Sequence, residues 1–232
     1  MIKINKVAVI GTGVIGAGWI IRCLAHNKIV HAYDKDIKLK KNLITEIKRT
    51  WPSVKKLFNK KKLNLKNFKY FTSIEEALKD VDLIQECASE NYALKTKLMS
   101  TIGKYSKSNA IISSSSSGLL PTKIYSKCKN PERAMIGHPF NPVYLLPAVE
   151  IVPGKKTSKR FLKIAKNFYN SILMPCNQDL YFRTEDNRYE KKYIPHSSIR
   201  PIDSSFGHCA ANPGNDKNFE KKLDKNIKEL LN

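Results

Sequence analysis

The stretch Val7-Ala8-Val9-Ile10-Gly11-Thr12-Gly13-Val14-Ile15-Gly16-Ala17-Gly18 joins an apolar strand to an apolar helix through a GxGxxG turn. In a βαβ unit of this kind the first glycine makes the tight turn, the second lets a pyrophosphate approach the backbone, and the third packs the helix against the strand. The free N–H groups of the helix N-terminus then bind the phosphates. The pattern predicts a dinucleotide site, and the alternative is a glycine-rich turn without a ligand. The candidate binding residues are Gly11, Gly13, Val14, Ile15, Gly16 and, after the next apolar run, Asp34.

Apolar segments of strand length alternate with helical patterns along residues 1–172. Strands are expected at residues 7–10, 29–33, 81–86, 110–112, 135–138 and 149–152. Helices are expected at residues 14–25, from residue 36 onward, and at residues 72–78, 91–102 and 158–169. This alternation predicts an α/β fold with a doubly wound parallel sheet of the Rossmann type.

The composition is that of a folded protein with a sizeable core, because 41% of the 232 residues are hydrophobic. No apolar run approaches the roughly 18 residues of a membrane span, so we expect no membrane partner. The first four residues lead directly into a strand, which leaves no room for a signal peptide and indicates a cytoplasmic protein. The five cysteines lack the spacing of zinc ligands, so we expect reduced thiols and no metal site.

The net charge of +22 would attract polyanions, including nucleic acid. Most of this charge comes from lysines scattered along the chain, whereas arginine, which binds phosphates and bases with its planar fork, is sparse. The densest cluster comprises Lys55, Lys56 and residues 60–62. We interpret it as a solvated helix face, with a local site for an anionic substrate as the alternative. Specific nucleic-acid binding is not expected, and charge-driven binding to nucleic acid or membranes would weaken steeply with salt.

Three polar residues could carry chemistry beside the dinucleotide. His138 ends one expected strand and Glu150 lies in the next, and a proline-containing connection that folds back could bring them together. A carboxylate paired with an imidazole orients the ring and favours its protonated form, which suits a base that takes a proton from an alcohol. Ser117, at the end of another strand on the nucleotide-binding side, could hydrogen-bond the same alcohol oxygen. The alternative is a structural histidine in a proline-rich turn.

Four stretches are typical of one known family. They are Val9-Ile10-Gly11-Thr12-Gly13-Val14-Ile15-Gly16, Gln85-Glu86-Cys87-Ala88-Ser89-Glu90-Asn91, Ser115-Ser116-Ser117-Gly118-Leu119-Leu120-Pro121-Thr122 and Gly137-His138-Pro139-Phe140-Asn141-Pro142-Val143-Tyr144-Leu145-Leu146-Pro147-Ala148-Val149-Glu150. Through them, residues 6–172 resemble the NAD-binding domain of the 3-hydroxyacyl-CoA dehydrogenase family, and within it the carnitine dehydrogenase branch. The resemblance implies NAD as the cofactor and a small-molecule substrate with a 3-hydroxyl group.

The resemblance also implies roles for individual residues. His138 corresponds to the general base, Glu150 to its partner carboxylate and Ser117 to the hydroxyl that binds the substrate oxygen. Asp34 corresponds to the acid that selects NAD over NADP, because a carboxylate accepts a hydrogen bond from the free 2′-hydroxyl and repels a 2′-phosphate. The remaining implied cofactor contacts are Glu90, Lys95 and Asn141.

Two substrates remain open within the family. The stretch from His138 to Pro147 resembles the carnitine enzymes more than those that act on CoA thioesters, which favours carnitine or a related small 3-hydroxy acid. Carnitine is itself a cation, however, so the lysine-rich helix offers it no attraction. The phosphates of a 3-hydroxyacyl-CoA thioester would suit that helix better, which makes this thioester the alternative substrate.

The family pattern breaks near residue 172, so we expect two domains, residues 1–172 and residues 173–232. The family continues with a helical domain that closes the substrate site and forms a homodimer. Here a short α/β tail stands in its place and resembles the C-terminal end of α/β-hydrolases related to homoserine O-acetyltransferase. Asp179 and His208 correspond to their triad acid and histidine, but no GxSxG nucleophile motif occurs, which argues against acyl transfer. We therefore expect impaired turnover, and the alternative is an NAD-binding module without turnover.

Overall fold

The computed structural model describes residues 4–57, 62–146, 148–169, 188–189, 191–192 and 217–231. The chain divides into two compact units, residues 1–146 with 150–168, and residues 147–149 with 169–232. The expected boundary at residue 172 and the tail residues Asp179 and His208 lie outside the described ranges, so these remain predictions.

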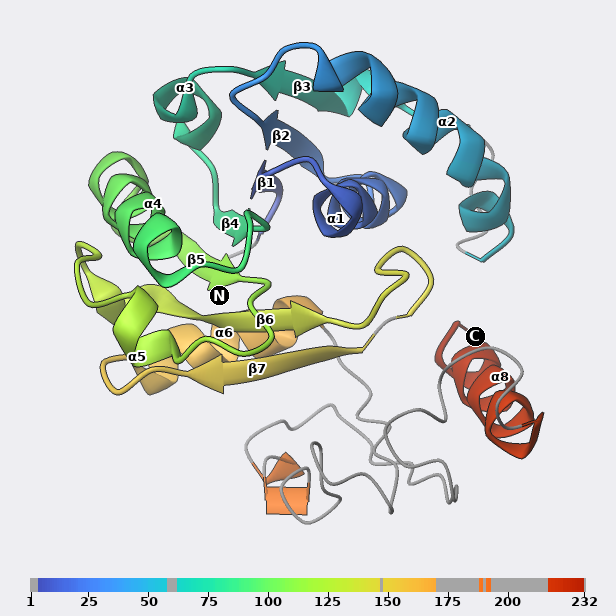
Figure 1. Ribbon diagram of the computed structural model, residues 1–232. Coiled ribbons are helices and arrows are strands. Elements are labelled where there is room, and N and C mark those ends of the chain that lie inside the picture. The colour runs from blue at the N-terminus through green and yellow to red at the C-terminus, as the bar shows by residue number, and fades with distance from the viewer. Residues whose placement is uncertain are drawn as a thin grey trace. The chain divides into compact units, whose positions relative to one another are not determined.

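A seven-stranded sheet in the order β3-β2-β1-β4-β5-β6-β7 forms the centre of the first unit (Figure 1). The strands are β1 (Lys6–Ile10), β2 (Ile29–Tyr33), β3 (Phe68–Phe71), β4 (Leu83–Glu86), β5 (Ile111–Ser114), β6 (Ala134–Pro139) and β7 (Val149–Pro153). All five pairs from β3 to β6 are parallel, which confirms the predicted Rossmann-type fold. The strand order reverses direction between β1 and β4, and ligands of such sheets bind at the carboxyl ends of the strands there.

Two strands differ from the expected pattern. The β6 and β7 arrows point in opposite directions in Figure 1, so the last strand is an antiparallel edge. Only residues 140–148 connect these two strands, and a parallel neighbour needs a crossover of about a dozen residues or more. The other difference is β3, an edge strand that sequence reasoning missed, because its half-exposed aromatic residues form no clear buried run.

Helices cover both faces of the sheet. They are α1 (Val14–Ala25), α2 (Leu39–Leu57), α3 (Ile74–Leu78), α4 (Tyr92–Tyr105), α5 (Pro121–Ile124) and α6 (Lys159–Tyr169), with short 3-10 turns η1 (Leu65–Asn67) and η2 (Pro131–Arg133). Figure 1 shows α1 and α2 on one face and α3 and α4 on the other. In the second unit the structure describes α8 (Lys217–Leu231). None of the described helices has the length and hydropathy needed to cross a bilayer.

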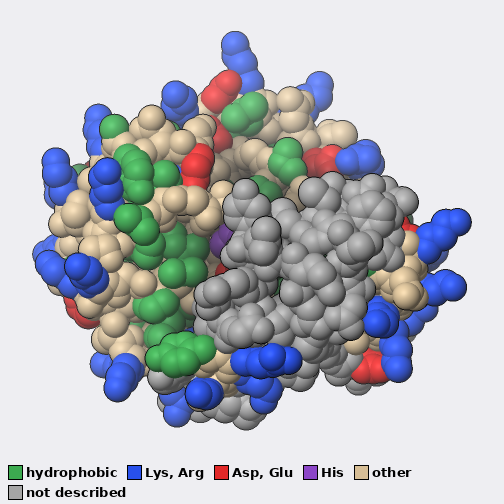
Figure 2. Space-filling view, turned by 60° about the horizontal axis from the view of Figure 1, so that its bottom comes forward, with side chains coloured by type: hydrophobic (Ala, Val, Ile, Leu, Met, Phe, Trp, Pro, Cys, Tyr) green, Lys and Arg blue, Asp and Glu red, His purple; other side chains and the backbone are tan. Residues whose placement is uncertain are grey.

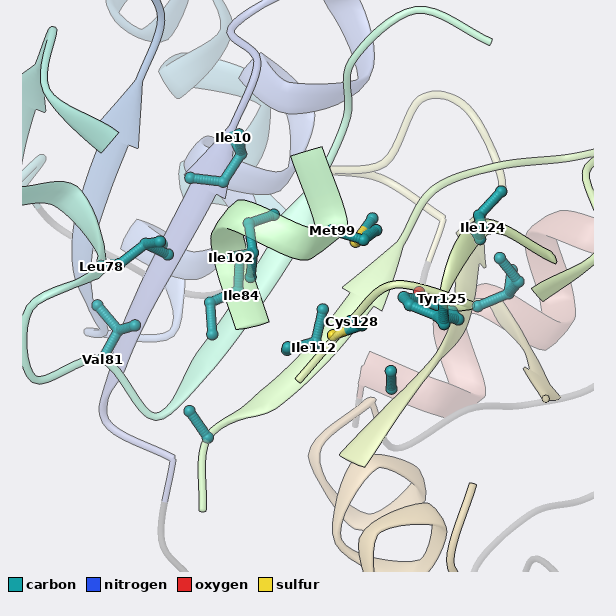
Figure 3. Close-up of a cluster of buried hydrophobic side chains, with 14 residues drawn as sticks. Ile10, Leu78, Val81, Ile84, Met99, Ile102, Ile112, Ile124, Tyr125 and Cys128 are labelled. Atoms are coloured by element: carbon teal, nitrogen blue, oxygen red, sulfur yellow. The ribbon is translucent and has the colours of Figure 1, made fainter. Parts of the chain in front are cut away.

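The core explains why the central strands are continuous apolar runs. Ala8 and Ile10 of β1 lie in a buried cluster with Ile84 of β4 and Ile112 of β5, and α3 and α4 supply further members (Figure 3). Val7 and Val9, which alternate with them, are equally buried. A strand buried on both faces has no polar alternation, so its whole sequence is apolar.

Arg133, the last residue of η2, is fully buried (0% exposed) and holds the end of α4 in place. Its guanidinium donates hydrogen bonds to the carbonyl oxygens of Gly103 (3.2 Å), Lys107 (2.6 Å) and Ala110 (3.0 Å) and to the Ser106 hydroxyl (3.0 Å). The last carbonyls of a helix lack partners within the helix, and a cation is favoured there by the helix dipole. Arg133 thus fixes the turn that leads from α4 into β5.

Replacing this side chain tests its role. Arg133→Ala should lower the free energy of unfolding by about 3 kcal/mol, because buried carbonyls lose their donors. Urea unfolding followed by circular dichroism measures the change. Arg160→Ala on α6, at an exposed position, is the matched control and should change the free energy by about 0.5 kcal/mol or less. Equal losses in the two variants would contradict the assignment.

Candidate cofactor and catalytic site

Two glycines of the GxGxxG turn are required by close backbone contacts. Gly11 has φ +96°, and a Cβ there would lie 2.9 Å from the carbonyl oxygen of Cys87. A Cβ on Gly16 would lie 1.9 Å from the carbonyl oxygen of Gly11. No other residue fits either position without moving the backbone. The contacts bring β1, the segment after β4 and α1 together at the carboxyl edge of the sheet.

Gly13 differs from its two neighbours in the turn, because no atom lies within 4 Å of a Cβ built on it. It is the N-cap of α1 and provides no side chain for the first N–H groups of the helix. Open space before uncapped N–H groups is what a phosphate needs. Val14 is 75% exposed beside this space and Ile15 is half-buried. The turn therefore fits the pyrophosphate of a dinucleotide.

Asp34 follows β2 at the same edge and is held against the glycine turn. Its Oδ2 accepts hydrogen bonds from the backbone N–H of Thr12 (3.0 Å) and from the Thr12 hydroxyl (3.1 Å). The half-buried carboxylate is thereby fixed to Thr12, which lies between Gly11 and Gly13 in the chain. In dinucleotide-binding folds, an acid at this position accepts a hydrogen bond from the ribose 2′-hydroxyl, so Asp34 fits NAD.

His138 and Glu150 form the pair that the sequence suggested. The ring Nδ1 of His138, in β6, lies 2.8 Å from Oε2 of Glu150, in β7. Both side chains are partly exposed, at 23% and 21%. The antiparallel turn between β6 and β7 produces this pairing, because it places residues separated by 12 positions on neighbouring strands. With Nδ1–H directed at the carboxylate, Nε2 is left to accept a proton.

Glu90 organises the loop that contains Ser117. Its Oε1 accepts hydrogen bonds from the Ser116 hydroxyl and from the N–H groups of Ser117 (3.2 Å) and Gly118 (3.2 Å). Burial raises the pKa of Glu90, but the Ser116 and Gly118 hydrogen bonds and the nearby Lys95 charge outweigh it, so the pKa lies below its usual value. Ser117 is exposed in this loop.

Lys95 lies beneath this loop with only 1% of its side chain exposed. Its ammonium donates to both carboxylate oxygens of Glu86 (2.8 and 2.9 Å) and to the Ala88 carbonyl (2.9 Å), and lies 3.5 Å from Glu90. Glu86 is fully buried and also accepts a 2.5 Å hydrogen bond from the Ser114 hydroxyl. Sequence reasoning missed Glu86, although an acid at the end of an apolar strand is a signal that could have indicated it.

Gln85, a second residue missed from the sequence, joins the segments that contain Ser117 and His138. Its side-chain nitrogen donates to the Ser115 hydroxyl (2.8 Å) and to the Gly137 carbonyl (3.0 Å). Ser114 of β5 lies opposite Ile136 of β6 in parallel register, so Ser117 and His138 leave the sheet at the same edge. Asn141 follows in the exposed part of the next loop.

On the face drawn in Figure 2, the basic side chains are spread out and not gathered into one patch. Figure 2 shows the Lys and Arg side chains distributed over the visible face, with acidic and apolar groups between them. Lys55 and Lys56 are exposed on α2.

Of the described residues, no three His, Cys, Asp or Glu side chains are grouped to hold a metal ion. Cys23, Cys87 and Cys128 are free thiols, and burial raises the pKa of Cys87 to about 12.

Comparison with known proteins identifies the domain. Residues 6–175 match the sequence model described as 3-hydroxyacyl-CoA dehydrogenase, NAD binding domain. L-Carnitine dehydrogenase of Oceanobacillus iheyensis is 46% identical over 170 residues, which cover 73% of this chain and 55% of that enzyme. The enzyme of the same name from Staphylococcus epidermidis is 41% identical over 169 residues, which cover 73% of this chain and 53% of that enzyme. The chain thus spans about half the length of the curated relatives that it matches.

Solved structures agree on the fold. The 3-hydroxybutyryl-CoA dehydrogenase of Escherichia coli superposes with a TM-score of 0.65 at 27% identity, over 72% of this chain and 36% of that one. The (S)-3-hydroxybutyryl-CoA dehydrogenase of Ralstonia eutropha has a TM-score of 0.67 at 23% identity, over 88% and 65%. The second likeness supports the fold alone.

The lowered pKa of Glu90 predicts an acid-dependent contribution to stability. A carboxyl whose pKa is lowered in the folded state stabilises the fold at pH values above its usual pKa of 4.5. This stabilisation is lost as the pH falls through the folded-state pKa. Urea unfolding of wild type and Glu90→Gln should therefore differ most at pH 7 and converge at acidic pH. Glu75→Gln, at an exposed position of α3, is the control and should show a smaller change. A difference that stays constant with pH would refute the Glu90 assignment.

Proposed function

Since this chain belongs to the 3-hydroxyacyl-CoA dehydrogenase family and contains its NAD-binding domain, we propose that it is an NAD-dependent dehydrogenase that oxidises the 3-hydroxyl of L-carnitine or a similar small 3-hydroxy acid. The observation that carries the proposal is the 2.8 Å contact between His138 and Glu150. It lies at the edge of the sheet where the glycine turn and Asp34 fit the cofactor. An orienting carboxylate, a base and a nicotinamide are what the oxidation of a secondary alcohol requires.

Each residue of the proposed site has its own role in the oxidation. Nε2 of His138 takes the proton of the substrate hydroxyl, while Glu150 orients the ring and stabilises the imidazolium that forms. Ser117 would donate a hydrogen bond to the substrate oxygen, and Asn141 would contact the nicotinamide of bound NAD. NAD, when bound, accepts the hydride from the carbon that carried the hydroxyl. Glu90 and Lys95 act at the cofactor side, where Glu90 also holds the backbone of Ser117.

Carnitine is the first candidate substrate because the two relatives of that name are 46% and 41% identical to this chain. A 3-hydroxyacyl-CoA is the alternative, supported by the family description and by the exposed Lys55 and Lys56, which would attract its phosphates. The two substrates share the 3-hydroxyl and differ in charge. Direct comparison of both in one assay therefore separates them.

Cofactor binding can be tested separately from turnover. Gly13→Val should abolish NAD binding in isothermal calorimetry, because the side chain fills the space that a phosphate must enter. Gly13 has φ −65° and open surroundings, so valine fits there and circular dichroism should show a folded variant, with a stability loss of at most about 1 kcal/mol because valine is a poorer N-cap. NAD affinity within twofold of wild type would argue against a phosphate site at this turn.

Turnover is tested by NADH absorbance with L-carnitine and, in parallel, with 3-hydroxybutyryl-CoA. Wild type should produce NADH from one of them, and His138→Ala should lower kcat by about 10³-fold, since a general base contributes about 10²–10⁴-fold. NAD affinity of the variant should stay at the wild-type value. If wild type binds NAD but yields no more NADH than His138→Ala with either substrate, the chain is an NAD-binding module and the proposed activity is wrong.

A further inference from the structure

One side of α1 contacts both loops that contain the proposed catalytic residues. Trp19 donates a hydrogen bond from Nε1 to the Ser115 hydroxyl (3.3 Å), in the loop that leads to Ser117. Arg22, nearly one helical turn later, reaches the loop that leads from His138 to Glu150. The helix whose N-terminus fits the cofactor phosphates therefore also touches the segments on which the chemistry depends.

The Arg22 contact is specific and largely shielded from water. One guanidinium nitrogen donates to the carbonyl oxygens of Val143 (3.1 Å) and Leu146 (2.9 Å). Burial lowers the pKa of Arg22 to about 10. Hydrogen bonds from a charged donor are stronger than those between neutral groups, and the Arg22 bonds are partly buried, so losing the donor leaves two loop carbonyls short of a partner.

A second contact of a different kind joins the same helix to the same loop. A Cβ on Gly18 would lie 2.8 Å from Cβ of Val143, so only glycine permits this approach. Val143 is 1% exposed, which shows that its side chain is packed against the helix and not presented to solvent. The loop is also closed on itself, because the N–H groups of Leu145 and Leu146 donate to the Pro142 carbonyl.

We propose that Arg22 is a positioning residue that fixes the loop 140–146 to the cofactor-binding helix, with Gly18 providing the close contact. This loop is the covalent connection between His138 and Glu150 and contains Asn141. The Arg22 guanidinium binds loop carbonyls, and acts by holding the loop in the position from which the pair and Asn141 would face a bound nicotinamide. The proposal rests on the proposed dehydrogenase function for its consequence in catalysis, but the loop contact itself can be measured without activity.

Hydrogen exchange of the full chain, read by mass spectrometry, tests the contact directly. In Arg22→Met, amides of residues 143–146 should exchange about 10-fold faster than in wild type, since about 1.4 kcal/mol of local stability is lost with the two hydrogen bonds. Amides of β1 and the affinity for NAD should not change. Arg133→Met is the control, because it also removes an arginine that binds backbone carbonyls, and its largest effect should fall on the segment near residues 103–110.

Two further variants keep the test decisive if Arg22→Met is poorly folded. Arg22→Lys retains a donor and should restore part of the loop protection. Gly18→Ala should loosen the loop, because the added methyl group would lie 2.8 Å from Cβ of Val143. Unchanged exchange in the loop of a folded Arg22→Met, or faster exchange spread evenly over the chain, would overturn the proposal.

Activity supplies the second readout. With the substrate that wild type oxidises, Arg22→Met should lower kcat by about 10–100-fold, the scale on which small displacements of catalytic groups act, while KM for NAD stays constant. A parallel rise in KM for NAD with constant kcat would contradict the positioning role. Absence of NADH from wild type counts against the proposed function only, and the exchange data then decide on the contact of Arg22 with the loop.

Discussion

The close backbone approach at the glycine turn is the constraint on which the site depends. A Cβ on Gly11 would lie 2.9 Å from the Cys87 carbonyl oxygen of the segment after β4, and a Cβ on Gly16 would lie 1.9 Å from the Gly11 carbonyl oxygen. These contacts set α1 against both β1 and β4. Because α1 is a rigid element, its position then determines where Gly13 presents free N–H groups and where Trp19 and Arg22 reach the catalytic loops. The packing of α1 thus positions both the glycine turn and the loops that contain the proposed catalytic residues.

Buried charged side chains also shape the structure, and both Lys95 and Arg133 make several hydrogen bonds. Lys95 and Glu86 form an ion pair with almost no exposure, which would cost several kcal/mol in desolvation if either group were left alone. Hydrogen bonds from Ser114 and to Ala88 complete their coordination. The guanidinium of Arg133 instead donates hydrogen bonds to three carbonyl oxygens and one hydroxyl oxygen. In both cases the charged group orders irregular backbone next to a strand end, where regular hydrogen bonding stops.

Sequence reasoning succeeded where the requirement is local. The glycine turn, the Asp34 position and most strands follow from spacing within a few residues, and the structure confirms the fold that they predict. The sheet was predicted to be parallel, so the antiparallel direction of β7 is a difference, although a connection that folds back was expected to bring His138 and Glu150 together. Lys95 was expected at the cofactor, and the structure places its ammonium on Glu86, a partner that was not expected. Its contact with the cofactor stays a prediction.

The sequence by itself determined the βαβ unit, the cofactor class and the residue types available for chemistry, because steric needs of a turn and hydrophobic periodicity are encoded in neighbouring residues. Only the tertiary structure decided which side chains meet. The antiparallel return of β7 brings Glu150 to His138, and packing of α1 brings Arg22 to carbonyls that are 121 and 124 positions away in the chain. Such contacts depend on how strands and helices pack in three dimensions, and no local pattern of an arginine indicates which distant carbonyl it will bind.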